Sequence, residues 1–368
     1  MNLDRKTAVN VGLPVFALLV PLAASFGEFP MEDTSLPFRM TLIAMAIGLL
    51  VATVFVVLRH AETVAHYAGE PYGTLVLTLS VTTIEASLIV SMMLHGANNP
   101  TLARESVFST VMIVCAGVVG VCITLGGWRH RHQDLKRQGT SAFLAMLIAL
   151  TGFTLVLPNF TLASDPGTFS PTQMEFVSIL SILLYGSFVL AQMKRHREDF
   201  VEDLDHSTAE RPLAHGKGAA VGSALLVIGL VGIVLLAEEA AAGLEDGLVS
   251  LGIEQSDAVV GAFIATLVLM PESVAAIKAA LRNELQRSLN IALGSACATI
   301  GLTIPVVAAA GLLTGRSLTL GLSSGDTVLL VVALGTSIVS FGTGRTTVLT
   351  GLVHLVVFFA YLLLIVAP

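Results

Sequence analysis

The chain has 368 residues, of which 54% are hydrophobic and only 12% are charged. A soluble domain carries roughly twice this share of charged residues, because its surface faces water, so the composition excludes an ordinary soluble protein. The formal net charge of -7 is modest. The sequence contains no basic stripe with interleaved aromatic residues, so we expect no nucleic acid among the partners.

Apolar runs of about 18 residues indicate membrane-spanning helices, and such runs follow one another along the whole chain. The first run, after Asp4, Arg5 and Lys6, is similar to a signal peptide, and we expect it to be a first helix or signal anchor. The predicted fold class is an all-α polytopic membrane protein with about 11 transmembrane helices. We number these spans 1 to 11, at residues 11–26, 40–58, 72–94, 107–127, 142–157, 176–193, 219–236, 258–281, 289–313, 327–341 and 347–367.

The positions of Lys and Arg test this span count independently of apolarity, because cytoplasmic loops carry an excess of these residues. With a cytoplasmic N-terminus, 16 of them fall in cytoplasmic segments, and three, Arg39, Arg104 and Arg316, fall outside. The pattern predicts a multi-pass protein of the cell inner membrane, in contact with lipid. Its N-terminus would be cytoplasmic and its C-terminus periplasmic or extracellular.

The longest internal hydrophilic stretch separates spans 6 and 7. It opens with basic residues and continues with acidic ones, and it is either a solvated linker or a cation-sensing segment. We expect an N-terminal helix (1–37), a first five-helix repeat (38–193), a cytoplasmic acidic linker (194–218) and a second, inverted five-helix repeat (219–368).

Two stretches on either side of this linker resemble each other: GTLVLTLSVTTIEASLIV at 73–90 and GAFIATLVLMPESVAAIKAA at 261–280. Each has a glycine about a dozen residues before an acid, and each is followed by a span rich in Gly, Ser, Thr and Cys. Because each half has an odd number of spans, spans 3 and 8 cross in opposite directions. The halves are therefore predicted to be inverted repeats, as in many secondary transporters whose substrate site lies near the bilayer midplane.

The acids of these two stretches are Glu85 and Glu272, both near the middle of their spans. An ionised carboxylate at that depth costs at least about 2.5 kcal/mol, so such residues are candidates for function; the alternative is a structural carboxyl group satisfied by a nearby hydroxyl. We predict that both acids bind the transported cation or protons, and that they face each other around the pseudo-two-fold axis.

Other polar residues near the two acids are candidate ligands. Thr78 and Thr82 lie on the same face of span 3 as Glu85, and Pro271 removes a backbone donor before Glu272, which frees a carbonyl for a cation. For Ser295 and Thr299, a role in close helix packing is an equal alternative. The remaining candidates are Asn290 in span 9 and, as auxiliary residues, Ser109 and Thr110 in span 4.

Glu238 and Glu239 follow span 7, and we expect them in an outer loop. They would be either simply solvated or part of an electrostatic funnel for cations.

Proton coupling follows from the two carboxylates themselves. Two acids in a site of low dielectric cannot both stay ionised without a cation, so protonation expels the cation and the cation expels protons. Oxygen ligands suit Ca2+, Na+ or K+ better than Zn2+ or Cu2+. We therefore predict a cofactor-free cation/proton antiporter rather than an enzyme. A cation channel is the alternative of another class, against which the inverted repeat argues.

The stretches GTLVLTLSVTTIEASLIVSMML and TLVLMPESVAAIKAALRNELQRSLNIALGSACATIGLTIP resemble the Ca2+/cation antiporter superfamily, specifically its ChaA-type Ca2+/H+ antiporter branch. The resemblance implies an extra N-terminal helix before two inverted α-repeats, and Glu85 and Glu272 as the cation- and proton-binding acids. It also implies exchange of Ca2+, in some members Na+ or K+, for protons.

The superfamily's repeats commonly read Gly-Asn-x-x-Glu. This chain has Thr82 and Leu269 where the asparagines would stand. The sequence therefore leaves open whether Ca2+, Na+ or K+ is preferred.

Overall fold

The computed structural model describes residues 2–26, 36–68, 72–95, 99–162, 165–195, 200, 217–250 and 256–366. The predicted linker 194–218 lies almost wholly outside these ranges. The described residues are nearly all helical, and nine of their helices are long and apolar enough to cross a membrane. Two further helices carry shorter apolar stretches, at Asn10–Leu22 and Thr78–Met93. The predicted all-α, multi-pass fold is confirmed.

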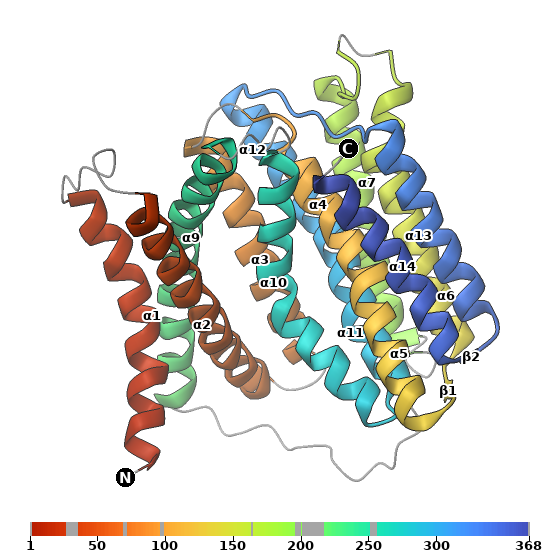
Figure 1. The fold of residues 1–368 in the computed structure, drawn as a ribbon, viewed down its shortest axis with the longest axis horizontal. Coiled ribbons are helices and arrows are strands. Elements are labelled where there is room, and N and C mark those ends of the chain that lie inside the picture. The colour runs from red at the N-terminus through yellow and green to blue at the C-terminus, as the bar shows by residue number, and fades with distance from the viewer. Residues whose placement is uncertain are drawn as a thin grey trace. The chain divides into compact units, whose positions relative to one another are not determined.

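The eleven predicted spans correspond to eleven described helical segments (Figure 1). Backbone polar groups find no water inside a bilayer, so a spanning segment satisfies them within its own helix. In chain order the segments are α1 (Asn2–Phe26), α2 (Leu36–Ala68), α3 (Tyr72–His95), α4–η2–α5 (Leu102–Met112, Ile113–Val118, Val119–His130), α6–η3–η4 (Arg137–Thr151, Gly152–Val156, Leu157–Phe160), α7–η5 (Pro171–Leu190, Ala191–Arg195), α9 (Lys217–Ser250), α10 (Ser256–Leu281), α11–η6–α12 (Leu285–Ala298, Thr299–Thr303, Ile304–Thr314), α13 (Ser324–Gly342) and α14 (Val348–Val366).

Span 7 is longer than predicted, because α9 continues to Ser250. The expectation that Glu238 and Glu239 lie in an outer loop is therefore wrong. The residues that follow span 7, AEEAAAGL at 237–244, are mostly strong helix formers. Their two acids lower the mean apolarity without ending the helix.

The chain divides into two compact units. The first contains α1, α2, α3 and α9, with α9 packed against the other three helices (Figure 1). Gly232 of α9 lies against the backbone of Ala17 and Leu18, where a Cβ atom would meet the Leu18 nitrogen at 2.9 Å. Small residues at such contacts let membrane helices approach closely.

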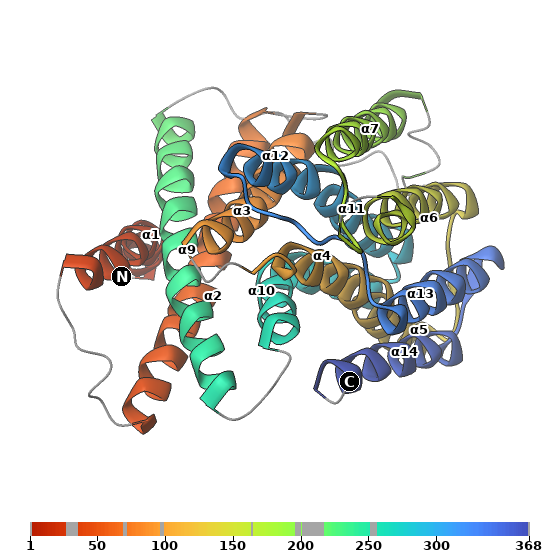
Figure 2. The ribbon, with the colours of Figure 1, turned by 90° about the horizontal axis from the view of Figure 1, so that it is seen from above.

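The second unit contains α4–α7 and α10–α14, and its contacts repeat in pairs. Helix α14, the last of the second repeat, packs on η2 and α5 of span 4. Helix α7, the last of the first repeat, packs in the same way on η6 and α12 of span 9. Helix α6 contacts both α11 and α13 (Figure 2). The contact of α14 with span 4 is thus the counterpart of the contact of α7 with span 9. Such matched contacts between the two halves are expected for inverted repeats.

Both contacts between a fifth helix and a span of the other repeat place an aromatic ring on a glycine of a π-helical turn. Phe358 of α14 lies against Gly117 in η2, and Tyr185 of α7 lies against Gly301 in η6. A Cβ atom on Gly301 would come within 2.8 Å of the Tyr185 Cβ atom. A small residue is therefore required at this contact.

A short antiparallel ribbon, β1 (Gln133–Asp134) with β2 (Arg345–Thr346), joins α5 to the turn before α14. The Gln133 amide also donates to the Ala280 carbonyl at 2.9 Å, and the Lys136 N–H donates to the Gln286 side chain at 2.8 Å. These bonds join β1 to the end of α10, and the start of α6 to the start of α11.

The close contact at Gly301 gives a stability prediction. Gly301→Ala is expected to lower the stability by about 1–3 kcal/mol, because the added methyl group overpacks the contact with Tyr185. Gly335→Ala is the matched control: a Cβ atom there meets nothing within 4 Å, and alanine is favoured over glycine in a helix by about 1 kcal/mol. The melting temperatures of both variants in detergent would test this prediction. Equal melting temperatures would contradict the predicted packing.

Candidate cation site

Glu85 lies in α3, in the first unit, and is 2% exposed. Thr82, one turn earlier on the same face, is also buried, and Thr78 is half-buried. The predicted polar stripe therefore occupies one continuous helix. An acid at this position is withdrawn from water in the middle of an apolar helix, where its charge needs a partner.

Helix α3 is tied to α9 by a second carboxyl group. The Ser91 hydroxyl, on α3, donates to Oε2 of Glu238 on α9 at 2.7 Å. Sequence analysis assigned Glu238 to an outer loop and therefore did not predict this contact with α3. The signal that could have found it is the helix-forming run that continues past the apolar residues of span 7.

Glu272 lies in α10, in the second unit, and is half-buried. Pro271 is inside the helix and is buried. The proline lacks the N–H that would reach the Leu267 carbonyl in a regular helix. The predicted local arrangement, an acid next to an interrupted stretch of helical hydrogen bonding, is present.

Two contacts fix α10 against span 4, on either side of Glu272. Near the start of α10, Gly261 packs against the backbone of Glu105 and Ser106. At its end, the carbonyl of Leu281 lies 3.0 Å from Nε2 of His130. Glu272 is about midway between the two contacts on α10, and η2 is about midway between them on span 4. The acid and the π-helical turn thus lie at a similar depth.

The described residues contain four π-helical turns, η2, η3, η5 and η6, and η2 and η6 occupy equivalent places in the repeats. Turn η2 begins at Ile113, 28 residues after Glu85, and η6 begins at Thr299, 27 residues after Glu272. Single π-helical turns inside α-helices occur frequently at functional sites. The residue pattern of spans 4 and 9 predicted polar, glycine-containing helices, but it did not predict this shift in hydrogen bonding.

The candidate residues of spans 4 and 9 are all in the second unit. Ser109 and Thr110 are buried in α4, and Thr299 is buried at the start of η6. Ser295, one turn earlier, is half-buried. Ser109 accepts a hydrogen bond of 2.6 Å from the Tyr361 hydroxyl, a partner that sequence analysis did not identify.

Asn290 lies in a network of protein hydrogen bonds near the start of α11. Its Oδ1 accepts from Gln286 at 2.8 Å, and its Nδ2 donates to the Phe200 carbonyl. Both ends of the amide are therefore engaged by other residues of the second unit. Its predicted role as a cation ligand stays a prediction, and the structure gives it a second, structural one.

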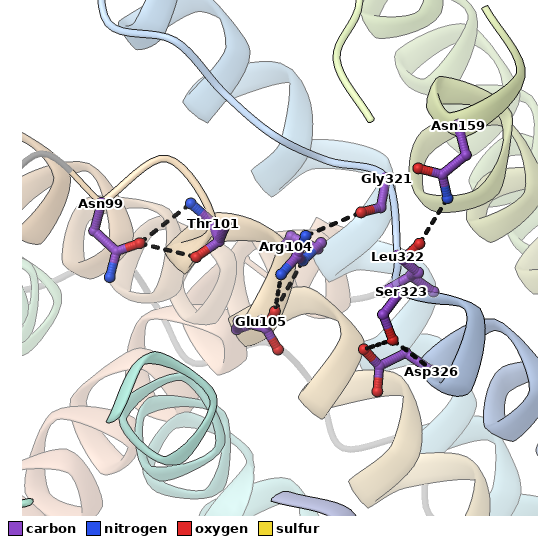
Figure 3. A network of polar contacts seen from close by, with 9 residues as sticks. All are labelled: Asn99, Thr101, Arg104, Glu105, Asn159, Gly321, Leu322, Ser323 and Asp326. Atoms are coloured by element: carbon purple, nitrogen blue, oxygen red, sulfur yellow. Dashed lines mark hydrogen bonds and ion pairs between the residues drawn. The ribbon is translucent and has the colours of Figure 1, made fainter. Parts of the chain in front are cut away.

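The start of span 4 is held by the polar network in Figure 3. Arg104 pairs with Glu105 at 2.5 Å and donates to the Gly321 carbonyl at 3.0 Å. Asn159 donates to the Leu322 carbonyl at 2.6 Å. The extended segment before α13 is thereby fastened to α4 and to the end of span 5. Glu105, one turn from Ser109, has its charge balanced by Arg104.

The structure therefore groups the candidates within each unit. Glu85, Thr82 and Thr78 share α3, whereas Glu272 and Pro271 share α10 in the unit that also holds the candidates of spans 4 and 9. That Glu85 and Glu272 serve one cation together stays a prediction.

The sequence profile of the sodium/calcium exchanger protein family matches residues 38–194 and 221–367. The chain belongs to this family. The two matched stretches contain α2–α7 and α9–α14 respectively. The predicted membership of the Ca2+/cation antiporter superfamily is confirmed.

Among characterised sequences, the chain is similar to the putative ionic transporter y4hA of Sinorhizobium fredii, with 42% identity over 99% of this chain and 100% of that protein. It is also similar to the sodium-potassium/proton antiporter ChaA of Escherichia coli, with 37% identity over 99% of this chain and 97% of that protein. These matches run the full length of the chain.

Among solved structures, the fold is similar to the Ca2+/H+ antiporter protein YfkE. The TM-score is 0.70, at 15% sequence identity, over 98% of this chain and 99% of that one. At this identity the likeness shows the fold.

Asn290 offers a test of its two roles. Asn290→Ala is expected to lower the stability by about 1–3 kcal/mol, because it leaves the Phe200 carbonyl and the Gln286 side chain without this partner. Arg287→Ala is the control, since its ion pair with Glu284 is exposed on the arginine side and such pairs contribute little. Melting temperatures in detergent would check this. A stable Asn290→Ala protein with weakened cation binding would instead favour the ligand role.

Proposed function

We propose that this protein is a secondary active cation/proton antiporter in which Glu85 and Glu272 bind the cation or protons in turn. The observation that carries the proposal is one intramembrane acid at an equivalent place in each inverted repeat, with Glu85 almost fully buried. A buried carboxylate needs a counter-charge, and either a cation or a proton supplies it.

The proposed topology has an N-terminal helix (1–37), two inverted repeats (38–193 and 219–368) and a cytoplasmic linker between them (194–218). The charge distribution supports a cytoplasmic N-terminus and a C-terminus on the other side of the inner membrane. Alternating access of the acids to the two sides would then couple the movements of cation and proton, because the two compete for the same groups.

The proposed exchange is of Ca2+ for protons, because carboxylate, hydroxyl and carbonyl oxygens are the ligands that this ion takes. The YfkE antiporter, which shares the fold, acts on Ca2+. Thr82, Thr78, Ser295 and Thr299 would supply hydroxyl oxygens beside the two acids.

Exchange of Na+ or K+ for protons is the second candidate, and two observations favour it. By the resemblance to the superfamily, Thr82 and Leu269 stand where its repeats commonly have asparagines, so the amide oxygens of a Ca2+ shell are fewer. The ChaA relative is a sodium-potassium/proton antiporter.

The two candidates are separated by proton flux in proteoliposomes with a preset pH gradient. Dissipation on addition of Ca2+ alone would establish Ca2+/H+ exchange, and dissipation by Na+ or K+ alone would establish the second candidate. Dissipation by all three would show a broad site. No response to any of these cations would overturn the antiporter proposal.

Replacing either acid tests the roles of the carboxylates. Glu85→Gln and Glu272→Gln are each expected to abolish cation-dependent proton flux while leaving the protein folded, because glutamine keeps the side-chain shape but can neither ionise nor exchange a proton. Glu175→Gln, which changes an exposed acid on α7, is the control and is expected to transport normally. Normal exchange by either site variant would contradict the assignment.

A further inference from the structure

One face of α14 contacts the part of span 4 that carries the candidate ligands. His354, Phe358 and Tyr361 are spaced i, i+4 and i+7 and therefore share this face. His354 is fully buried and Tyr361 is 2% exposed. Together they reach from Ser109 to Gly117.

The first contact is made by Tyr361. Its hydroxyl donates to the Ser109 oxygen at 2.6 Å, and its ring packs edge-on against Phe108, with centroids 5.7 Å apart. The serine hydroxyl has two lone pairs and one hydrogen. The bond from Tyr361 occupies one lone pair, so it orients the other lone pair and the hydrogen.

The second contact is made by His354 with a carbonyl of the π-helical turn. In a regular α-helix the Val119 N–H would donate to the Cys115 carbonyl, four residues earlier. In η2 that N–H is directed instead to the carbonyls of Val114 and Ala116. Nδ1 of His354 lies 2.8 Å from the Cys115 oxygen and so brings a donor from another helix to this carbonyl.

This bond selects the tautomer of the neutral imidazole. A carbonyl oxygen only accepts, so Nδ1 carries the hydrogen, and Nε2 of the neutral ring is left as an acceptor. The Ser340 hydroxyl lies 2.9 Å from Nε2 and can donate to it. The ring is thus held between α13 and span 4, with both nitrogens used.

The aromatic contact on the π-helical turn has an equivalent in the other repeat. There Tyr185 of α7 lies against Gly301 through its Cβ atom and ring. Tyr185 therefore corresponds to Phe358, and not to His354 or Tyr361.

We propose that Tyr361 and His354 are positioning residues of the transport site. Tyr361 orients the Ser109 hydroxyl toward the cation, and His354 maintains the π-helical turn of span 4 at the depth of Glu272. This inference rests on the proposed function, because Ser109 matters only if span 4 contributes to the cation site.

The test for Tyr361 is a double-mutant cycle with Ser109, read as the cation concentration for half-maximal proton flux in proteoliposomes. Tyr361→Phe removes only the hydroxyl, and it is expected to raise this concentration roughly three- to tenfold with little change in maximal rate. Ser109→Ala should do the same. The double variant should match Ser109→Ala alone, because Tyr361 acts through the serine.

Tyr185→Phe is the matched control, since it removes a tyrosine hydroxyl from the equivalent helix of the other repeat. It is expected to leave the half-maximal concentration unchanged. An unchanged value for Tyr361→Phe, or effects of Tyr361→Phe and Ser109→Ala that add, would overturn the role of Tyr361. A wild-type protein without cation-dependent flux would instead overturn the proposed function, and the inference with it.

The test for His354 uses two replacements of similar size. Asn places an amide N–H near the position of Nδ1 and can still donate to the Cys115 carbonyl, whereas Leu cannot. His354→Leu is expected to raise the cation concentration for half-maximal proton flux about tenfold or more. His354→Asn is expected to show a concentration close to that of the wild type. If His354→Leu does not fold, His354→Asn is compared with the wild type. A tenfold higher half-maximal cation concentration in a normally folded His354→Asn protein would overturn the positioning role of His354. Equal transport by the Leu variant and wild type would also overturn it.

Discussion

The constraint on which the structure depends is the absence of water around the backbone inside the bilayer. Every N–H and carbonyl must find a partner in the protein, so the spanning chain is helical. Wherever the helix is interrupted, another residue has to complete the hydrogen bonding. At the π-helical turn of span 4, His354 on a helix of the other repeat lies at hydrogen-bond distance from the Cys115 carbonyl. At Pro271 the interruption lies beside Glu272 itself, where a cation could take the place of the missing donor as the partner of a carbonyl.

The same constraint explains why the two repeats are interleaved. Helix α14 packs against span 4 of the first repeat, and α7 packs against span 9 of the second. Gly301 is needed because a Cβ atom there would come within 2.8 Å of the Tyr185 Cβ atom, and Gly117 lies against the Phe358 ring at the equivalent contact. Each of these two spans is thus covered by a helix of the opposite half. On span 4 this support includes the hydrogen bonds of His354 and Tyr361.

The sequence predicted those features that depend on apolarity and depth. The apolar runs located the spans, and the odd number of spans in each half predicted the inverted repeats. The depth of Glu85 and Glu272 marked them as candidates, although their action on one cation stays a prediction. The length of α9 was underestimated because Glu238 and Glu239 broke the apolar run without breaking the helix. The π-helical turns, and the engagement of Asn290 by Gln286 and Phe200, depend on which atoms meet in three dimensions. Residue spacing along a single helix carries no information on such contacts between helices.

The central claim is that cations and protons compete for the same carboxylates. The most direct measurement is the number of protons released when the purified protein binds Ca2+, Na+ or K+, obtained by calorimetry in buffers of different ionisation enthalpy. The account predicts release of at least about one proton per bound cation at a pH where the acids are partly protonated. It also predicts that release disappears in the Glu85→Gln, Glu272→Gln double variant. Cation binding with no proton release at any pH, or undiminished release from that variant, would contradict it.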